Sequence, residues 1–373
     1  MKAMKLCSII FGLLLTSAVQ ASVVINEENF PDKAFRSLIA NMPEGKDGIL
    51  TDEELAGLKQ LYVKDYDHKI QSFQGLEYLS ELEALEISLV YYTEELDLSK
   101  NPKLEFINIE LGGFKYLNLS GLSSLKNCFI DGLPFLTEID LSTCPSLKFL
   151  SFRNCNLMSL DLSNNTLLQT LDCNSNLITS LDLSNNINLK EVYLWNNKLS
   201  SLDLSNNIDL EALDCSNNLL TSLDLSRNAA LRGLWCNNNS LEALDLSYNT
   251  MLIFLSCVYN GISDERMTSL VNSLPQATNG GQVFLEDRVY GSDSNKCTEE
   301  QKQIAIGKNW TVLRELPLVC AGGGGGHTLG VDAPQNVHSY PSGDYYTLDG
   351  RRINWQDRHR GIYIQNGKKV IVK

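Results

Sequence analysis

Residues 210–226 read LEALDCSNNLLTSLDLS, and this pattern recurs throughout residues 147–262. Its second half, Leu/Ile-Asp/Asn-Leu-Ser, returns every 21 residues, apart from one step of 22. A fixed period of this length indicates a solenoid, in which each repeat forms one coil that stacks on the next. The copies of this half begin at Leu96, Leu117, Ile139, Leu160, Leu181, Leu202, Leu223 and Leu244.

The first half of the repeat fits L-x-x-L-x-L-x-x-N-x-L and resembles the leucine-rich-repeat family, in the variant that carries two L-x-L segments per 21-residue coil. The resemblance covers residues 58–262 and implies a leucine-rich-repeat solenoid, a right-handed β-rich superhelix of about ten coils. Copies of this half begin at Leu58, Leu82, Leu104, Leu125, Leu147, Leu168, Leu189, Leu210, Leu231 and Leu252.

One coil alone cannot bury enough apolar surface to offset the entropy lost on ordering 21 residues. Stacked coils share a leucine core and backbone hydrogen bonds, so the repeats fold together. An asparagine at a fixed place in each coil can satisfy the backbone groups left where the chain turns out of its strand. This predicted ladder comprises Asn176, Asn197, Asn218, Asn239 and Asn260, with Cys155 in the same place one coil earlier.

The net charge of −14 argues against nucleic acid as a partner, and we expect a monomer. Residues 1–21 combine an early basic segment with an apolar run too short to span a bilayer. They predict a secretory signal peptide cut after Ala21, and no transmembrane segment elsewhere. The mature protein is therefore expected to be secreted or held at the cell surface, with outer-membrane association as one form of attachment.

Residues 22–57 are expected to form a helical N-terminal cap. Pro31 can open one helix, and Thr51-Asp-Glu-Glu54 is a capping box that opens another. The segment from Asp47 imitates the second half of a calcium-binding EF-hand loop, but two ligand places fall on Pro43 and Gly45, which have no side-chain oxygen. Calcium near Asp47 stays an open alternative, and no metal or cofactor is predicted.

The 21-residue rule stops after residue 262, and residues 263–316 alternate helix and strand patterns. Helices are predicted at 263–274 and 298–306, and strands at 282–285 and 310–313. This alternation resembles the α/β C-terminal caps of secreted bacterial leucine-rich-repeat proteins of internalin-like architecture. Cys297 and Cys320 could pair, which the sequence leaves open.

A Gly-rich linker at 317–326 precedes a small all-β tail at 327–373. The tail holds seven Lys and Arg against four Asp, a net charge of +3, so the rest of the chain carries −17. Asn366-Gly367 predicts a hairpin turn. The tail resembles the C-terminal sorting modules of proteins that Bacteroidota export by the type IX pathway; the alternative is an accessory hairpin.

The cysteines and histidines do not form a catalytic or metal-binding pattern. Four of the ten cysteines occupy the inward L-x-C place and are expected to act as small, reduced core residues, namely Cys173, Cys215, Cys236 and Cys257. His68, His327, His338 and His359 cannot be assembled into a Cys-His or Ser-His-Asp arrangement. No phosphate loop is present, so we do not expect an enzyme.

A row of aspartates follows the second half of the repeat. Like charges about 5 Å apart repel, so we expect backbone or Ser/Asn hydrogen bonds in the next turn to compensate them; a row of bound cations is the alternative. The row comprises Asp97, Asp140, Asp161, Asp182, Asp203, Asp224 and Asp245, with Asn118 in the missing place.

The outward positions of the first half vary between copies, unlike the rest of the repeat. If this half supplies the strand, these positions line the concave sheet. Exposed aromatics beside carboxylates suit a protein or carbohydrate ligand. The alternatives are that the rings pack on one another across coils, and that the solenoid is a structural or display spacer without a ligand. The candidate ligand-binding residues are Asp172, Tyr193, Trp195, Asp214, Trp235, Phe254 and Tyr259.

Overall fold

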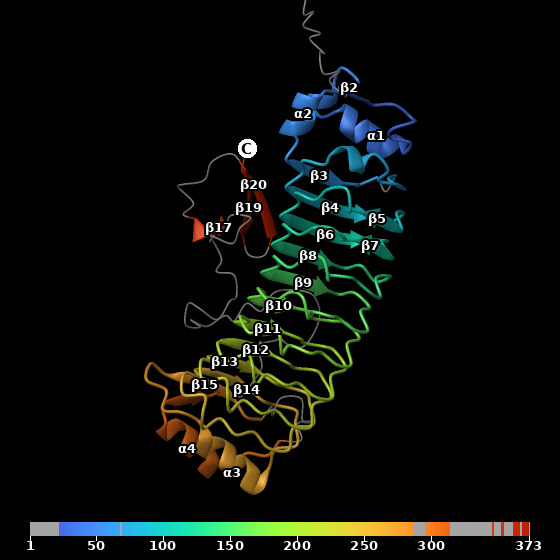
Figure 1. The fold of residues 1–373 in the computed structure, drawn as a ribbon. Helices are drawn as coiled ribbons and strands as arrows, with labels where there is room; N and C mark the ends of the chain where they lie inside the picture. The colour runs from blue at the N-terminus through green and yellow to red at the C-terminus, as the bar shows by residue number, and fades with distance from the viewer. Residues whose placement is uncertain are drawn as a thin grey trace, which may run out of the picture.

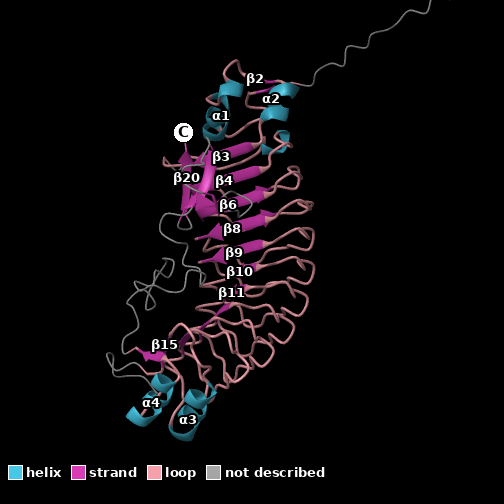
Figure 2. Cartoon of the chain, turned by 90° about the vertical axis from the view of Figure 1, so that its left-hand side faces the viewer, coloured by secondary structure: helices cyan, strands magenta, loops and turns pink. Residues whose placement is uncertain are grey.

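The computed structural model describes residues 22–67, 69–286 and 295–313, and the backbone of four strands between 345 and 372. The repeats form an elongated, curved solenoid, with a parallel sheet along the concave side and turns along the convex side (Figures 1 and 2). The leucine-rich-repeat fold expected from the sequence is confirmed.

The first half of each repeat supplies one strand of a twelve-stranded parallel sheet. Ten strands come from the ten predicted coils and bound nine complete turns, and the C-terminal cap adds two more. The ten are β3 (Gln60–Lys64), β4 (Ala84–Val90), β6 (Phe106–Gly112), β8 (Asn127–Asp131), β9 (Phe149–Arg153), β10 (Thr170–Asp172), β11 (Glu191–Tyr193), β12 (Ala212–Asp214), β13 (Gly233–Trp235) and β14 (Phe254–Ser256).

The core is a set of aligned apolar stacks that run the length of the solenoid. The strands pair in register, so that Leu171, Val192, Leu213 and Leu234 are neighbours across β10 to β13. All four side chains are fully buried. The period of 21 residues therefore translates into a constant register, because every coil returns the same position to the same place in the sheet.

The second half of the repeat forms mainly turns rather than a second sheet. Only β5 (Glu95–Asp97) and β7 (Tyr116–Asn118) pair there as strands. In the turns, each aspartate of the predicted row accepts a hydrogen bond from the backbone N–H of the serine two residues later. For Asp161 and Ser163 the distance is 2.9 Å, and the same contact recurs in the other coils.

These hydrogen bonds confirm the expected compensation of the aspartate row. Hydrogen bonds from the hydroxyl and the backbone N–H of the serine lower the pKa of five aspartates of the row. No group of three or more His, Cys, Asp or Glu in the described ranges is placed to hold a metal ion. The hydrogen bonds of the turn therefore compensate the carboxylates of this row.

The predicted asparagine ladder is present. The Asn218 amide donates to the carbonyl oxygens of Leu194 at 2.9 Å and Cys215 at 3.1 Å, and it accepts from the Leu199 N–H at 3.0 Å. Asn295 in the C-terminal cap continues the ladder by accepting hydrogen bonds from the Asn260 and Ile262 N–H groups. The ladder therefore joins each coil to its neighbours and the last coil to the cap.

A second buried asparagine ladder, which was not predicted from the sequence, follows the L-D-L-S half. The Asn186 amide donates at 3.0 Å to the Leu162 and Asn165 carbonyl oxygens of the preceding coil. The sequence carries a signal for this ladder, because an asparagine recurs two residues after the serine in the pattern L-D-L-S-x-N. The members are Asn101, Asn165, Asn186, Asn207, Asn228 and Asn249, all fully buried.

The N-terminal cap closes the first coil with short elements. These are β1 (Val23–Val24), α1 (Lys33–Ala40), η1 (Pro43–Gly45), β2 (Ile49–Leu50) and α2 (Asp52–Gly57), followed in the first coil by η2 (Leu76–Tyr78). The predicted capping box is confirmed, because Thr51 and Glu54 exchange backbone and side-chain hydrogen bonds. In the imitation of an EF-hand loop, the Asp47 side chain accepts a hydrogen bond from the Ile49 N–H.

The C-terminal cap follows the predicted order of helix and strand. Its elements are α3 (Asp264–Ser273), β15 (Gly281–Phe284), α4 (Glu299–Gly307) and β16 (Trp310–Val312). Strands β15 and β16 extend the solenoid sheet in parallel. The cap therefore covers the apolar face of the last coil and also lengthens the sheet.

The described tail strands form a separate antiparallel sheet in the order β18-β17-β19-β20. Strands β19 and β20 flank residues 366–367 and pair antiparallel, as the hairpin prediction required. The strands are β17 (Tyr345–Tyr346), β18 (Arg352–Ile353), β19 (Gly361–Gln365) and β20 (Lys368–Val372).

The four predicted core cysteines are buried free thiols. Cys173, Cys215, Cys236 and Cys257 are all fully buried, which confirms their inward placement. Cys320 lies outside the described residues, so its pairing with Cys297 stays an alternative. Within the described ranges, no helix is both long and apolar enough to cross a membrane.

Candidate binding face of the sheet

The first half of the repeat supplies the concave strands, so the candidate residues lie on the outer face of the sheet. Asp172, Tyr193, Asp214 and Trp235 are consecutive cross-strand neighbours on β10 to β13. Adjacent strands lie about 4.8 Å apart. The structure therefore gathers four of the seven candidates into one row in which a carboxylate alternates with an aromatic ring.

The other three candidates flank this row. Phe254 lies opposite Gly233, which places it one row nearer the start of the strands. Trp195 follows β11 and lies on the side toward the strand ends. Tyr259 lies beyond β14 in a turn, where it adopts a left-handed backbone conformation with φ 56°.

The expected exposure of the aromatics is wrong for Trp235 and Phe254. Their side chains are only 6% and 5% exposed. The two rings stack with centroids 4.7 Å apart, and Phe254 also contacts Phe284 of the cap, with centroids 6.0 Å apart. These rings form an apolar cluster with Val258, against which Tyr259 and Leu313 pack. The alternative that rings pack across coils holds at this end of the sheet.

Asp214 is also buried, with 2% of its surface exposed. Its carboxylate accepts a hydrogen bond from the Ser216 N–H at 2.9 Å. The accessible part of the candidate face therefore lies earlier in the solenoid, on β8 to β11, where Asp172, Tyr193 and Trp195 are each partly exposed.

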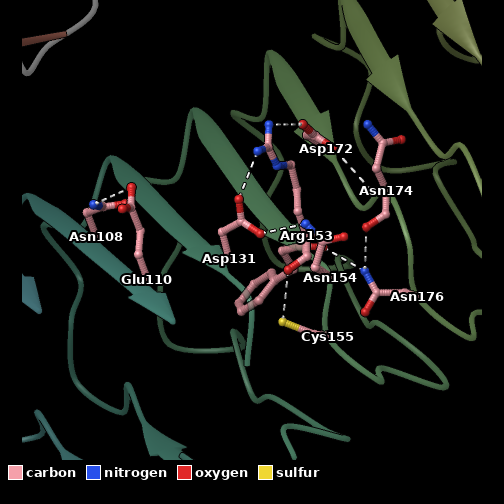
Figure 3. Close-up of polar contacts among 10 residues, drawn as sticks. Asn108, Glu110, Asp131, Arg153, Asn154, Cys155, Asp172, Asn174 and Asn176 are labelled. Atoms are coloured by element: carbon pink, nitrogen blue, oxygen red, sulfur yellow. Dashed lines mark hydrogen bonds and ion pairs between the residues drawn. The ribbon is translucent and has the colours of Figure 1, made fainter. Parts of the chain in front are cut away.

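Arg153, which was not among the candidates predicted from the sequence, lies at the centre of this accessible part. Its guanidinium lies 2.8 Å from an Asp131 carboxylate oxygen and 3.9 Å from one of Asp172 (Figure 3). The Asn154 amide donates to the second Asp131 oxygen at 2.7 Å. Three successive strands thus hold one cation between two carboxylates, with the Arg153 side chain 36% exposed.

Asp172 is the most perturbed carboxylate of this network. Burial raises its pKa to about 6, against the lowering effects of the Arg153 charge and the hydrogen bond from the Asn174 N–H. The charges of Asp131 and Asp214 contribute to this rise. Only 18% of the side chain is exposed. The face therefore carries a carboxylate that is incompletely compensated near neutral pH.

Arg153, Asn174 and Trp195 follow one another on three coils at the carboxyl ends of the strands. The Asn174 side chain accepts a hydrogen bond from the Trp195 N–H at 2.7 Å, which links the two later coils. Arg153 and Trp195 thus lie two coils, or about 10 Å, apart along the face. No sequence signal could have singled out Arg153, because outward positions of the repeat are free to vary.

We call the open face the set Asp131, Arg153, Asp172, Asn174, Tyr193 and Trp195. A partly exposed arginine held by carboxylates, with aromatic rings beside it, is the composition typical of a recognition surface. The set contains neither a nucleophile with an adjacent base nor the ligand set of a metal site. Its side chains can donate and accept hydrogen bonds and offer ring faces for stacking.

The chain is similar to solved bacterial leucine-rich-repeat structures. An internalin, inlF, of Listeria monocytogenes shares 18% identity at a TM-score of 0.49, covering 80% of this chain and 100% of that one. The functional domain of InlJ from Listeria monocytogenes, described as including a cysteine ladder, shares 22% at 0.35, covering 71% and 82%. A leucine-rich-repeat protein of Leptospira interrogans shares 15% at 0.47, covering 70% and 80%. No protein-family model and no curated protein matches the chain.

Proposed function

We propose that this chain is an exported, non-catalytic interaction protein that binds a protein partner on the open face of its solenoid. The observation that carries the proposal is Arg153, held between Asp131 and Asp172 at 2.8 and 3.9 Å. This pairing orients the guanidinium before any partner arrives, which lowers the entropic cost of binding. Arginine and tryptophan are also the residues most often found to dominate protein interfaces.

A partner array tests the proposal. Purified mature chain would be applied to an array of extracellular and cell-surface proteins, and the Kd of each hit would be measured for the wild type and its variants. We expect Arg153→Ala and Trp195→Ala to weaken binding by about 2 kcal/mol, roughly 30-fold. Tyr248→Ala is the matched control, because Tyr248 is 60% exposed in a turn away from this face.

The spacer function is the second candidate, and the buried Trp235 and Phe254 pair favours it. Rings that pack on one another stabilise the solenoid without offering a ligand surface. If no array protein binds at micromolar concentration, or if both face variants bind like the wild type, the interaction function is wrong and the spacer function remains.

Export and anchoring complete the proposal. Support comes from the basic and apolar residues of 1–21 and from the resemblance of the tail at 327–373 to type IX sorting modules of Bacteroidota. Residues 1–21 lie outside the described residues. Intact-mass measurement of protein recovered outside the cell tests both parts: a start at residue 22 supports the signal peptide, and loss of the tail supports sorting. An unprocessed chain retained inside the cell would overturn them.

A further inference from the structure

Four exposed tyrosines lie on the first concave strand or just beyond the ends of the first two, outside the open face described above. Tyr66 is 69% exposed, Tyr92 65%, Tyr91 45% and Tyr62 43%. Large exposed rings are costly unless they are used, and a group of them marks a binding surface more often than scattered ones do. We call these residues the tyrosine edge.

The sheet brings the tyrosine edge together. Strands β3 and β4 are parallel and in register through Lys64 and Ser88, so their carboxyl ends lie side by side. The Asp65 N–H donates to the Ser88 carbonyl oxygen at 3.2 Å, which keeps the chain beside β4 beyond the end of β3. Tyr66 follows there, and Tyr91 follows the end of β4. The backbone segments that carry these rings therefore lie side by side, about one strand spacing apart.

Positively charged, negatively charged and amide side chains lie near these rings. The Lys64 ammonium lies 4.7 Å from the centroid of the Tyr66 ring. Lys69 pairs with Asp67 at 2.9 Å. On β6 the Asn108 amide donates to Glu110 at 3.2 Å (Figure 3). The exposed groups thus include cations and carboxylates, and the buried Asp65 and Glu86 add negative charge beside Tyr66 and Tyr62, which disfavours an anionic ligand.

We propose that the tyrosine edge binds a neutral oligosaccharide, a site separate from the open face. Tyrosine rings offer flat apolar faces on which the C–H face of a pyranose can stack, and their hydroxyls stay in water. Ammonium, amide and carboxylate groups at the margin can exchange hydrogen bonds with sugar hydroxyls. The groups named at this edge include neither the arginine nor the tryptophan that argues for a protein partner on the open face, so ring stacking and hydrogen bonding to a sugar fit it better.

Titration of the purified mature chain with four neutral hexasaccharides tests this site, with cello-, chito-, manno- and maltohexaose as the probes. We expect at least one to bind with a Kd below about 1 mM. In the double variant Tyr66→Ala/Tyr92→Ala its Kd should rise at least about tenfold, and Tyr66→Phe should stay within about threefold because the ring remains. Tyr248→Ala and Trp195→Ala are the controls and should bind as the wild type does.

Because the exchanged tyrosines are exposed, thermal melting of the double variant should match the wild type, which separates loss of the site from loss of the fold. Binding of none of the four sugars, or equal binding by wild type and double variant, overturns the inference. The protein array reports on the open face alone, since it responds to Arg153 and Trp195. Each proposal can therefore fail without the other.

Discussion

The charge state of Asp172 should affect the free energy of unfolding. Its pKa in the folded chain is about 6, above the ordinary 3.8, so the folded state binds more protons than the unfolded state between these values. Its contribution to stability is therefore complete below about pH 4 and is lost as pH rises through 6. At neutral pH the ionised carboxylate costs up to about 3 kcal/mol.

We predict that Asp172→Asn gains stability relative to the wild type as pH rises from 4 to 7, measured by denaturant unfolding at several pH values. Asp161→Asn is the control. Hydrogen bonds from Ser163 lower the pKa of Asp161, so the folded state releases that proton more readily than the unfolded state. This control should therefore lose relative stability as pH rises only below about pH 4, and it should change little from pH 4 to 7. A pH-independent difference for Asp172→Asn would contradict the assignment of the network.

The core thiols should be inert in the native protein. Burial raises the pKa of Cys173 and Cys236 well above the ordinary value, and the thiolate is the reactive form. We predict that Cys173, Cys215, Cys236 and Cys257 resist iodoacetamide until the chain is denatured, as followed by peptide mass spectrometry. Rapid alkylation of all four without denaturant would show that the L-x-C place is not inward.

At the scale of the element, the inward asparagine decides whether a coil can turn. The Asn218 amide donates to three carbonyl oxygens, those of Leu194, Cys215 and Ser216, and accepts from one backbone N–H, that of Leu199. Asn218→Ala leaves these buried groups without partners and should lower the free energy of unfolding by about 3 kcal/mol. Chemical denaturation monitored by circular dichroism measures the loss.

Asn206 provides the matched control for this element. It is exposed and makes a single hydrogen bond, to the Ser184 carbonyl oxygen at 3.1 Å. Asn206→Ala should change the free energy of unfolding by less than about 1 kcal/mol. Equal losses for the two variants would mean that the ladder does not hold the coils together.

At the scale of the whole molecule, the linker should be the site of first cleavage. Residues 322–326 are five consecutive glycines, and such a segment gains little by ordering. Limited proteolysis should remove the tail while residues up to about 316 survive, as read by mass spectrometry. A tail that resists cleavage under these conditions would be docked on the rest of the chain, and its role as a sorting module would lose support.

The sequence by itself determined the coils, the inward ladder and both caps. Each depends on a local or periodic rule: a leucine every few residues, an asparagine at a fixed place, or a capping box at Thr51. Such rules act in the same way on every coil. The fold class and the core cysteines followed from them before any contact was known.

Only the tertiary structure decided which outward residues are open. Trp195 and Trp235 occupy similar sequence contexts, yet Trp235 is buried because Phe254 stacks on it and Phe284 of the cap packs behind. Arg153 lies between the carboxylates of Asp131 and Asp172 because the register of the sheet places these residues on the two strands beside its own. Outward side chains take their environment from neighbours about 21 residues away in sequence, so exposure depends on which residues meet across strands and on where the cap closes the sheet.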